Sequence, residues 1–261
     1  EAYLETNGMG NGIANDDYVT TANIDTVINL FISNLAISDL TGIEDFISLT
    51  ILNCENNQIG TLDLVQNQSL ELLECNNNLL TNLTFSKNSI KLIRCSNNQL
   101  INIDLTNCLD LEWFTCRNNQ ITSLDFSGSN NLIGIYCSYN SIDSLNLTTN
   151  LNLGEIVCNS NQLTNINVTQ NANLYSLFCA ENQINNLNLT NNVLLEALHC
   201  YDNQLGYLDL SNQSNLIELQ CMYNPLYYLN LRNGNNHNLL CDGIIPLSCE
   251  ALKTITSLSC I

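Results

Sequence analysis

Positively charged residues are scarce in this sequence. Lys and Arg together number 6 in a chain of 261 residues, against 25 Asp and Glu, so the formal net charge is −19. A field of that sign repels phosphate backbones and anionic lipid surfaces, and no basic run interrupts it. We therefore expect no nucleic-acid partner.

Long apolar runs and catalytic groupings are also missing. No apolar run approaches the ~20 residues that a membrane-spanning helix requires, so we expect no membrane insertion. The 2 histidines, His199 and His237, have no nucleophile at a useful spacing, and the chain has no Gly-rich phosphate loop. We therefore expect neither an enzyme nor a bound cofactor. The chain begins at Glu1 rather than at Met, which indicates a processed or trimmed product.

What the sequence does contain is a repeat that carries a column of cysteines. Nine cysteines are spaced by 21 residues, with a single step of 20. An asparagine stands three residues after each one, and apolar residues stand five and two before it and five, eight and ten after it. The unit therefore reads LxxLxCxxNxLxxLxLxxNxx. The nine ladder cysteines are Cys54, Cys75, Cys95, Cys116, Cys137, Cys158, Cys179, Cys200 and Cys221.

Each repeat predicts one coil of a solenoid. Both halves of the unit carry an LxxLxL signature, and alternate residues of a short strand point to the same side. A coil of two strands and two turns is too thin to bury its own apolar edge, so the stacked coils must form the core together. The asparagine column suits tight turns, and its amides can cap backbone groups and bond neighbouring coils.

The pattern resembles the leucine-rich repeat superfamily, and within it the 21-residue cysteine-ladder class, also called IRREKO or internalin J-like. The resemblance covers residues 27–232 and implies a β-rich, right-handed solenoid of about ten coils, with parallel strands on two faces and little helix. It implies binding rather than catalysis. Residues 1–26 resemble the N-terminal cap of secreted flavobacterial (Bacteroidetes) proteins of this kind, which implies export to the bacterial surface or medium. Residues 233–261 are expected to form a C-terminal cap, because a solenoid end exposes apolar edge.

The cysteine column has three possible explanations. A zinc site needs four ligands that converge on one point, whereas single cysteines on successive coils form a row. Disulfides between adjacent coils are disfavoured, because parallel neighbours hold their Cβ atoms ~5 Å apart and a bridge prefers ~3.8 Å. A column of small, buried core residues remains. Cys108 stands at a turn position that most other copies give to Asn, and we expect a tolerated substitution there.

Three further cysteines, Cys241, Cys249 and Cys260, follow the last repeat. In an oxidising compartment, two of the three could staple the C-terminal cap and leave the third free or intermolecular. We expect a Cys241–Cys249 disulfide first, although the connectivity stays open at this point.

A stretch near the N-terminus partly resembles a calcium-binding EF-hand loop. Glu5, Asn7 and Asp17 stand at ligand positions, but Met9 replaces an expected Asp and Gly12 is an insertion. We favour a Gly-rich turn of the cap over a metal site, because the loop has lost part of its ligand charge.

The residues that flank the buried pair on the first strand of each coil should point out from one continuous surface. Aromatic side chains gather there in the later coils, and exposed aromatic residues mark interfaces. The competing explanation is that aromatic residues simply suit strands. Arg94 and Arg117 lie on adjacent coils, where they either pair with Glu74 or receive an acidic partner. The candidate binding face is Arg94, Trp113, Arg117, Tyr136, Tyr139, Phe178, His199, Tyr201, Met222 and Tyr223.

Two functions follow from these features. The first is a secreted or cell-surface module, adhesin-like, that recognises a protein or glycan through the exposed strand face. The second is a structural subunit of a surface layer or extracellular filament. The leftover cysteine and the self-similar ends of a solenoid suggest this homo-oligomer.

Overall fold

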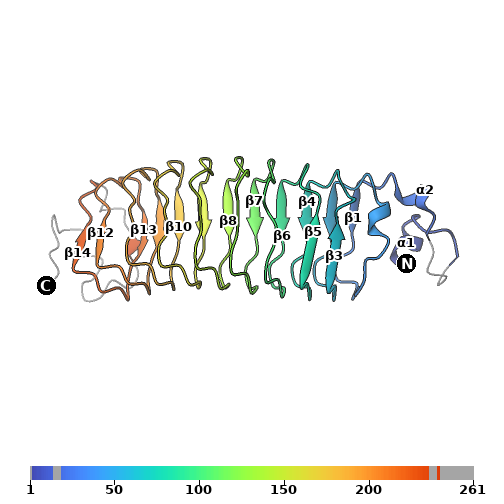
Figure 1. The fold of residues 1–261 in the computed structure, drawn as a ribbon, viewed down its shortest axis with the longest axis horizontal. Helices are drawn as coiled ribbons and strands as arrows, with labels where there is room; N and C mark the ends of the chain where they lie inside the picture. The colour runs from blue at the N-terminus through green and yellow to red at the C-terminus, as the bar shows by residue number, and fades with distance from the viewer. Residues whose placement is uncertain (1, 14–18, 235–239, 242–261) are drawn as a thin grey trace.

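The chain folds into an elongated solenoid. The computed structural model describes residues 2–13, 19–234 and 240–241. The coils stack side by side, from helix α1 (Ala2–Thr6) at one end to strand β14 (Tyr228–Asn230) near the other (Figure 1). The described residues form about ten turns and contain almost no helix, as the repeat predicts.

In the part of the chain that the structure describes, eleven short strands form one parallel sheet along the solenoid, and its outer side is called the strand face below. Neighbouring coils pair in register, so that Leu177 lies opposite Ile156 on one side and Leu198 on the other. The ladder cysteine after each strand, from Cys54 to Cys200, donates its N–H to the next coil at 2.7–2.9 Å. The strands, in order across the sheet, are β1 (Asn29–Phe31), β2 (Ile51–Asn53), β4 (Leu72–Glu74), β6 (Leu92–Arg94), β7 (Trp113–Thr115), β8 (Gly134–Tyr136), β9 (Glu155–Val157), β10 (Ser176–Phe178), β11 (Ala197–His199), β13 (Glu218–Gln220) and β15 (Leu240–Cys241).

The second half of each coil is extended, but it forms regular sheet in only a few places. In the described chain, β3 (Thr61–Leu64) pairs with β5 (Asn82–Phe85), β12 (Tyr207–Asp209) pairs with β14, and a single bridge joins Leu124 to Leu145. An Asp or Asn in this half commonly accepts the N–H two residues on, as Asp104 does from Thr106 at 3.0 Å. Such local bonds compete with the ladder between coils, which keeps this second face less regular than the predicted sheet.

The core lies between the two faces and includes the cysteine ladder. Every ladder thiol is buried, at 0% exposure in eight coils and 2% at Cys221, and all nine are free thiols. Leucine and isoleucine side chains surround them, and Phe114 packs edge-on against Phe126 with ring centroids 5.7 Å apart. Cys108 is also fully buried, so the turn position that it occupies faces the core.

The repeated asparagine is a cross-coil connector. Asn161 Nδ2 donates to the carbonyls of Cys137 in the preceding coil and of Cys158 in its own coil, at 3.0 and 3.1 Å. Its Oδ1 accepts the N–H of Ile142 at 3.0 Å. The left-handed turn itself lies one residue earlier than the sequence suggests, because the residue just before each asparagine has φ between 53° and 59°. The asparagine side chain therefore hydrogen-bonds the backbone groups around the turn, while the preceding residue adopts the left-handed conformation.

A second amide column stabilises the opposite turn. Asn171 is fully buried, and its Nδ2 donates to the carbonyls of Leu147 and Asn150 in the preceding coil at 3.1 and 2.8 Å. Asn150 and Asn192 each make the equivalent contacts with the coil that precedes their own. Cys108 occupies this column in its coil. Two amide columns, one at each turn, therefore bond successive coils.

The N-terminal segment packs on the first coils. Helices α1 and α2 (Thr21–Ile24) precede β1, and a 3-10 turn, η1 (Ile43–Asp45), lies before β2. Tyr3, Leu4, Met9 and Val19 pack against the apolar core. Among the described residues, no helix is long and apolar enough to cross a membrane. At the other end, Cys249 and Cys260 lie outside the described residues, so the predicted Cys241–Cys249 disulfide stays a prediction.

Candidate interaction surface on the strand face

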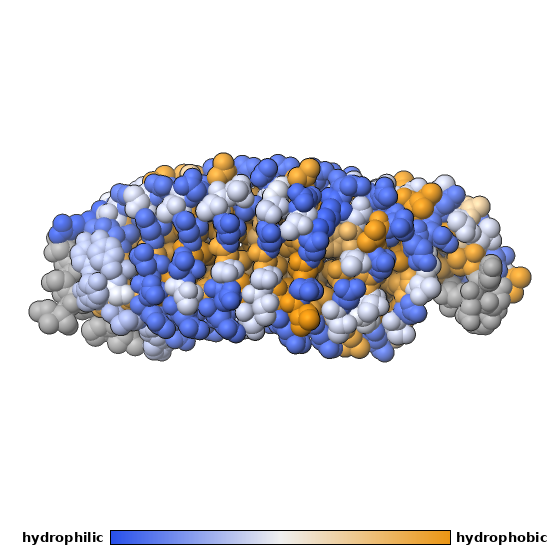
Figure 2. Space-filling model, viewed as in Figure 1, coloured by the Kyte–Doolittle hydropathy of each residue, from blue (hydrophilic) through white to orange (hydrophobic). Residues whose placement is uncertain are grey.

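Side chains on the strand face alternate between the core and the outside. In β7, β10 and β11, the middle residue is buried while its two neighbours are only half-buried. Successive coils repeat this alternation in register, so the outward residues form columns along the solenoid. Figure 2 shows the opposite long side of the solenoid, where β3, β5, β12 and β14 lie nearest the viewer, and there too rows of hydrophilic side chains run with apolar atoms between them. The outward columns are the surface on which a partner could lie.

An aromatic wall begins at β7. The Trp113 and Tyr136 rings stack with centroids 6.2 Å apart and planes 23° apart. The indole lies over Gly134, where an added Cβ would come within 2.2 Å of the ring. The absence of a side chain at Gly134 therefore lets Trp113 lie flat on the sheet.

Glu155 fixes this wall from the next coil. The Tyr136 hydroxyl hydrogen-bonds to one oxygen of the Glu155 carboxylate, and the Tyr175 hydroxyl donates to the other at 2.8 Å. The Tyr175 ring in turn covers Gly154, where a Cβ would lie 2.5 Å from it. Burial, together with Glu155, raises the pKa of Tyr175 to about 12, so this phenol stays a neutral donor at physiological pH. One carboxylate thus orients two aromatic rings.

A second aromatic group lies farther along the same face. The Phe178 ring and the His199 imidazole stack with centroids 3.9 Å apart and planes 4° apart. His199 Nε2 lies 2.5 Å from Glu218 Oε1. The half-buried imidazole is therefore held between a ring and a carboxylate.

Tyr139, Tyr201 and Tyr223 line the edge where the strands turn. Tyr139 and Tyr223 are 49% and 71% exposed, and both hold a left-handed backbone, with φ of 59° and 55°. The Tyr201 hydroxyl donates to Glu181 at 3.2 Å, and burial with Glu181 raises the pKa of this tyrosine. Met222 is half-buried beside Tyr223. These side chains extend the candidate face towards the C-terminal coils.

The cations of the face differ in their partners. Arg94 forms an ion pair with Glu74 at 2.5 Å, and Lys91 forms one with Glu71 at 2.8 Å. Arg117 is exposed, and its guanidinium contacts no hydrogen-bond or ion-pair partner among the described residues. Arg94, Arg117 and the wall residues enclose a shallow hollow of about 410 Å³, lined by Leu92, Arg94, Trp113, Thr115, Arg117 and Tyr136.

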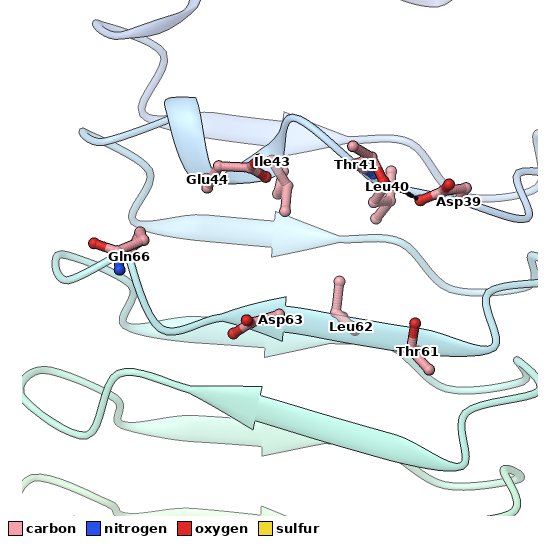
Figure 3. Close-up of a pocket in the computed structure, with 9 residues that line it drawn as sticks. All are labelled: Asp39, Leu40, Thr41, Ile43, Glu44, Thr61, Leu62, Asp63 and Gln66. Carbon is pink, nitrogen blue, oxygen red and sulfur yellow. Dashed lines mark hydrogen bonds between the residues drawn. The ribbon is translucent and has the colours of Figure 1, made fainter.

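Another hollow, of about 380 Å³, lies on the second face near the N-terminal end (Figure 3). Three carboxylates line it, and each caps a turn. Asp39 accepts the N–H and hydroxyl of Thr41, both at 2.8 Å, and these bonds hold the pKa of Asp39 below its ordinary value. Glu44 accepts the Gly42 N–H at 2.9 Å, and Asp63 accepts the Val65 N–H at 3.1 Å. Local structure accounts for these acids, so we assign no ligand to this hollow.

The calcium candidates near the N-terminus also have local roles. The Glu5 carboxylate accepts the N–H groups of Asn11, at 2.8 Å, and Gly12, at 3.1 Å. Asn7 Nδ2 donates to the Tyr3 carbonyl at 2.7 Å, and Asp17 lies outside the described residues. Within the described ranges, no three His, Cys, Asp or Glu side chains gather closely enough to hold a metal ion.

Sequence reasoning missed Glu155, Tyr175 and the two glycines beneath the rings. A signal for them existed, because Gly134 stands at the repeat position of Trp113, and Gly154 stands at that of Tyr175. A glycine in the same column as an aromatic residue of the adjacent coil indicates a ring lying flat on the sheet. No comparable feature of the sequence indicated that Arg117 would have no ion-pair partner.

Comparison with known proteins gives results for structure only. No protein-family model matches the chain, and no curated protein sequence does so. The functional domain of InlJ from Listeria monocytogenes, which includes a cysteine ladder, is 31% identical with a TM-score of 0.81. The match covers 85% of this chain and 54% of that one, so the chain spans about half of the InlJ domain.

Two more distant likenesses support the fold. YopM, a leucine-rich effector protein from Yersinia pestis, is 25% identical with a TM-score of 0.60, over 78% of this chain and 66% of that one. An internalin, InlF, from Listeria monocytogenes is 19% identical with a TM-score of 0.52, over 86% and 89%. The stacked coils, the nine buried thiols in one column and the InlJ likeness agree, and the chain is a leucine-rich repeat protein of the cysteine-ladder class.

Proposed function

We propose that this chain is a non-catalytic binding module that holds a protein partner on the strand face, between β6 and β13. The aromatic wall is the observation that carries this proposal. Trp113, Tyr136 and Tyr175 are large side chains that stacking, Gly134, Gly154 and Glu155 already hold in place. Ordering side chains at an interface costs free energy, so rings fixed beforehand bind at a lower entropic cost.

The composition of the face supports a protein as the partner. Trp, Tyr and Arg are the residues that most often dominate the energy of protein–protein interfaces, and here they lie in adjacent coils. The finer parts of the proposal are an adhesin-like role and a secreted or surface location on a bacterium. The likeness to the InlJ functional domain supports these parts, and a glycan ligand is the competing outcome of the experiment below.

A structural subunit that stacks end to end is less well supported. Stacking through the N-terminal end would need an open apolar edge on the first coil. Tyr3, Leu4, Met9 and Val19 already pack against the core there. Binding through the long side of the solenoid therefore remains the proposal.

The test removes the apolar side chains of the face and measures partner capture. The labelled wild-type protein and a variant with Trp113, Tyr136, Phe178 and Tyr201 all changed to Ser would be applied to arrays of surface and secreted proteins and to a glycan array. We expect the variant to lose at least tenfold in signal on the proteins that the wild type binds. Capture limited to glycans would contradict a protein partner.

A matched control removes exposed apolar residues elsewhere. Leu79, Ile101, Leu109 and Tyr227 are 49%, 58%, 59% and 68% exposed and lie outside the candidate face. Changing these four to Ser should leave the binding unchanged, while circular dichroism confirms that both variants stay folded. If the strand-face variant bound every captured partner as the wild type does, the proposed function would be wrong.

A further inference from the structure

We infer that the hollow over β6, β7 and β8 binds a carboxylate side chain of the protein partner, with Arg117 as its counter-ion. The hollow thus selects a peptide segment in which Asp or Glu stands next to an apolar or flat side chain. This inference rests on the proposed function and narrows it to one subsite and one chemistry of partner. It assigns the acid to Arg117, and the neighbouring side chain to the Trp113 ring.

Charge is the first argument. The whole chain carries 25 acidic residues and 6 basic ones, so most cations should find an acid within the molecule. Lys87, Lys91 and Arg94 do so, with Asp104, Glu71 and Glu74. Arg117 has no such partner in the described chain, although acidic residues heavily outnumber basic ones. Its missing counter-ion is therefore expected to come from outside.

The lining of the hollow is the second argument. It contains two guanidinium groups, from Arg94 and Arg117, and no carboxylate. Glu74 neutralises only the first of them. An incoming carboxylate can accept two N–H bonds from the Arg117 guanidinium in a bidentate arrangement, which an ammonium could not offer.

The aromatic wall is the third argument. Trp113 lies flat over Gly134, and the Tyr136 hydroxyl is already bonded to Glu155. Both rings line the hollow beside Arg117, so an apolar or planar side chain can pack on a surface that needs no rearrangement. Apolar burial next to the ion pair excludes water and strengthens the electrostatic attraction.

The same lining disfavours an acidic saccharide. A sugar presents several hydroxyl groups that need acceptors as well as donors. In this hollow, two hydroxyl oxygens, of Thr115 and Tyr136, are the side-chain groups that can accept them, because the guanidiniums only donate and the Tyr136 proton is already given to Glu155. The net charge of −19 on the chain repels a phosphate-rich polymer. An acidic peptide fits the available groups best.

The experiment uses paired peptides on the full-length chain. An array would carry 12-residue probes, each with a single Glu or Asp beside Phe, Leu or Trp, next to a twin in which Gln or Asn replaces the acid. We expect the wild type to prefer the acidic twin by about tenfold, and Arg117→Gln to reduce that preference to below twofold. Lys87→Gln removes the same charge from the second face, in a different coil, and should keep the full preference.

Gly134→Ala separates the wall from the charge. The added Cβ would displace the Trp113 ring without altering any charged group. We expect this variant to bind both twins of a pair at least fivefold more weakly while keeping the acidic preference. Gly60→Ala is the control, since a Cβ there meets no atom within 4 Å.

Three results would overturn the inference. The first is an acidic preference that survives Arg117→Gln. The second is equal binding of acidic and neutral twins by the wild type, with both lost in the four-Ser strand-face variant, which would leave the proposed function standing. The third is Arg117-dependent capture of acidic saccharides in place of peptides. Acidic peptides that bind equally to the four-Ser variant would instead contradict the proposed function itself.

Discussion

The residue just before each repeated asparagine holds a left-handed backbone conformation. In four coils it is itself an asparagine, namely Asn56, Asn77, Asn97 and Asn118. In later coils, Tyr139, Ser160, Glu181 and Tyr223 take the same conformation. For a residue with a bulky side chain this conformation costs about 1–2 kcal/mol, whereas Asn adopts it readily. The tyrosines therefore stand where the backbone disfavours them, which is a common property of functional positions.

Relief of this backbone cost is testable at Tyr223, which is 71% exposed. We expect Tyr223→Asn to raise the free energy of unfolding by about 0.5–1 kcal/mol, because it removes left-handed strain and little buried contact. Urea denaturation followed by circular dichroism measures the change.

The reverse substitution provides the control for this prediction. Asn56 occupies the same position with φ of 55°, so Asn56→Tyr should destabilise the chain by a similar amount. No gain in stability from Tyr223→Asn would show that contacts of the Tyr223 ring outweigh the backbone term.

The turn after each strand is the element that connects the coils. Its asparagine satisfies the carbonyl groups of two coils and one N–H, all of them in partly buried positions. Leaving a buried polar group without a partner costs more free energy than an ordinary hydrogen bond contributes. This side chain therefore stabilises the fold by more than its buried surface area alone would. The Gly and ring pairs act at the same scale on the strand face, because each fixes one aromatic side chain between two coils.

Asn161→Ala tests the turn element. The change leaves three carbonyl groups, of Cys137, Cys158 and Asn159, and the Ile142 N–H without this partner. We expect a loss of about 2–4 kcal/mol in the free energy of unfolding, measured by urea denaturation. Asn186→Ala, at an exposed position of the second face, should change it by less than about 0.5 kcal/mol. Equal effects of the two substitutions would mean that the repeated asparagine is not a structural connector.

At the scale of the whole molecule, the stacked coils share one core, and the thiol column runs through it. Burial raises the pKa of Cys95 and Cys137 from 9.0 to about 12. Burial, with the neighbouring thiols as a smaller cause, also raises the pKa of Cys116 and Cys158 well above the ordinary value of a thiol. Thiols of this kind are poor nucleophiles, since only the thiolate reacts. The column is therefore inert packing for as long as the solenoid stays intact.

Alkaline pH should unfold the molecule through this column. The unfolded chain releases its thiol protons near pH 9, whereas the native core keeps them until about pH 12. The native state then binds more protons than the unfolded state, so its stability falls as pH rises through this window. Each buried thiol contributes about 1.4 kcal/mol per pH unit to that fall.

Urea denaturation between pH 8 and pH 11 measures this slope. Cys137→Ala should lower the slope by one proton, at a cost of about 1 kcal/mol in stability at neutral pH. Rapid alkylation of the native ladder by a bulky reagent at pH 8, or a stability that does not change with pH, would contradict the buried column.

Much of this molecule could be predicted from its sequence. The 21-residue spacing identified the core positions, because a side chain that recurs once per coil must face the same way in every coil. The same spacing placed Cys54 to Cys221 in one buried column and Trp113, Tyr136 and Phe178 beside it on the strand face. The periodicity predicts which residues are buried and which are exposed, because burial depends only on the direction in which each Cβ atom points.

Only the tertiary structure decided which groups meet. It showed that Glu155 accepts hydrogen bonds from two tyrosines and that Glu74 forms an ion pair with Arg94. It also showed that Arg117 has no counter-ion among the described residues. It also moved the left-handed turn to the residue before the asparagine and reduced the second face to isolated strand pairs. The physical reason is that repetition determines the side to which a residue points. Its partner depends on distances between atoms of neighbouring coils, which the spacing of residues along the chain does not contain.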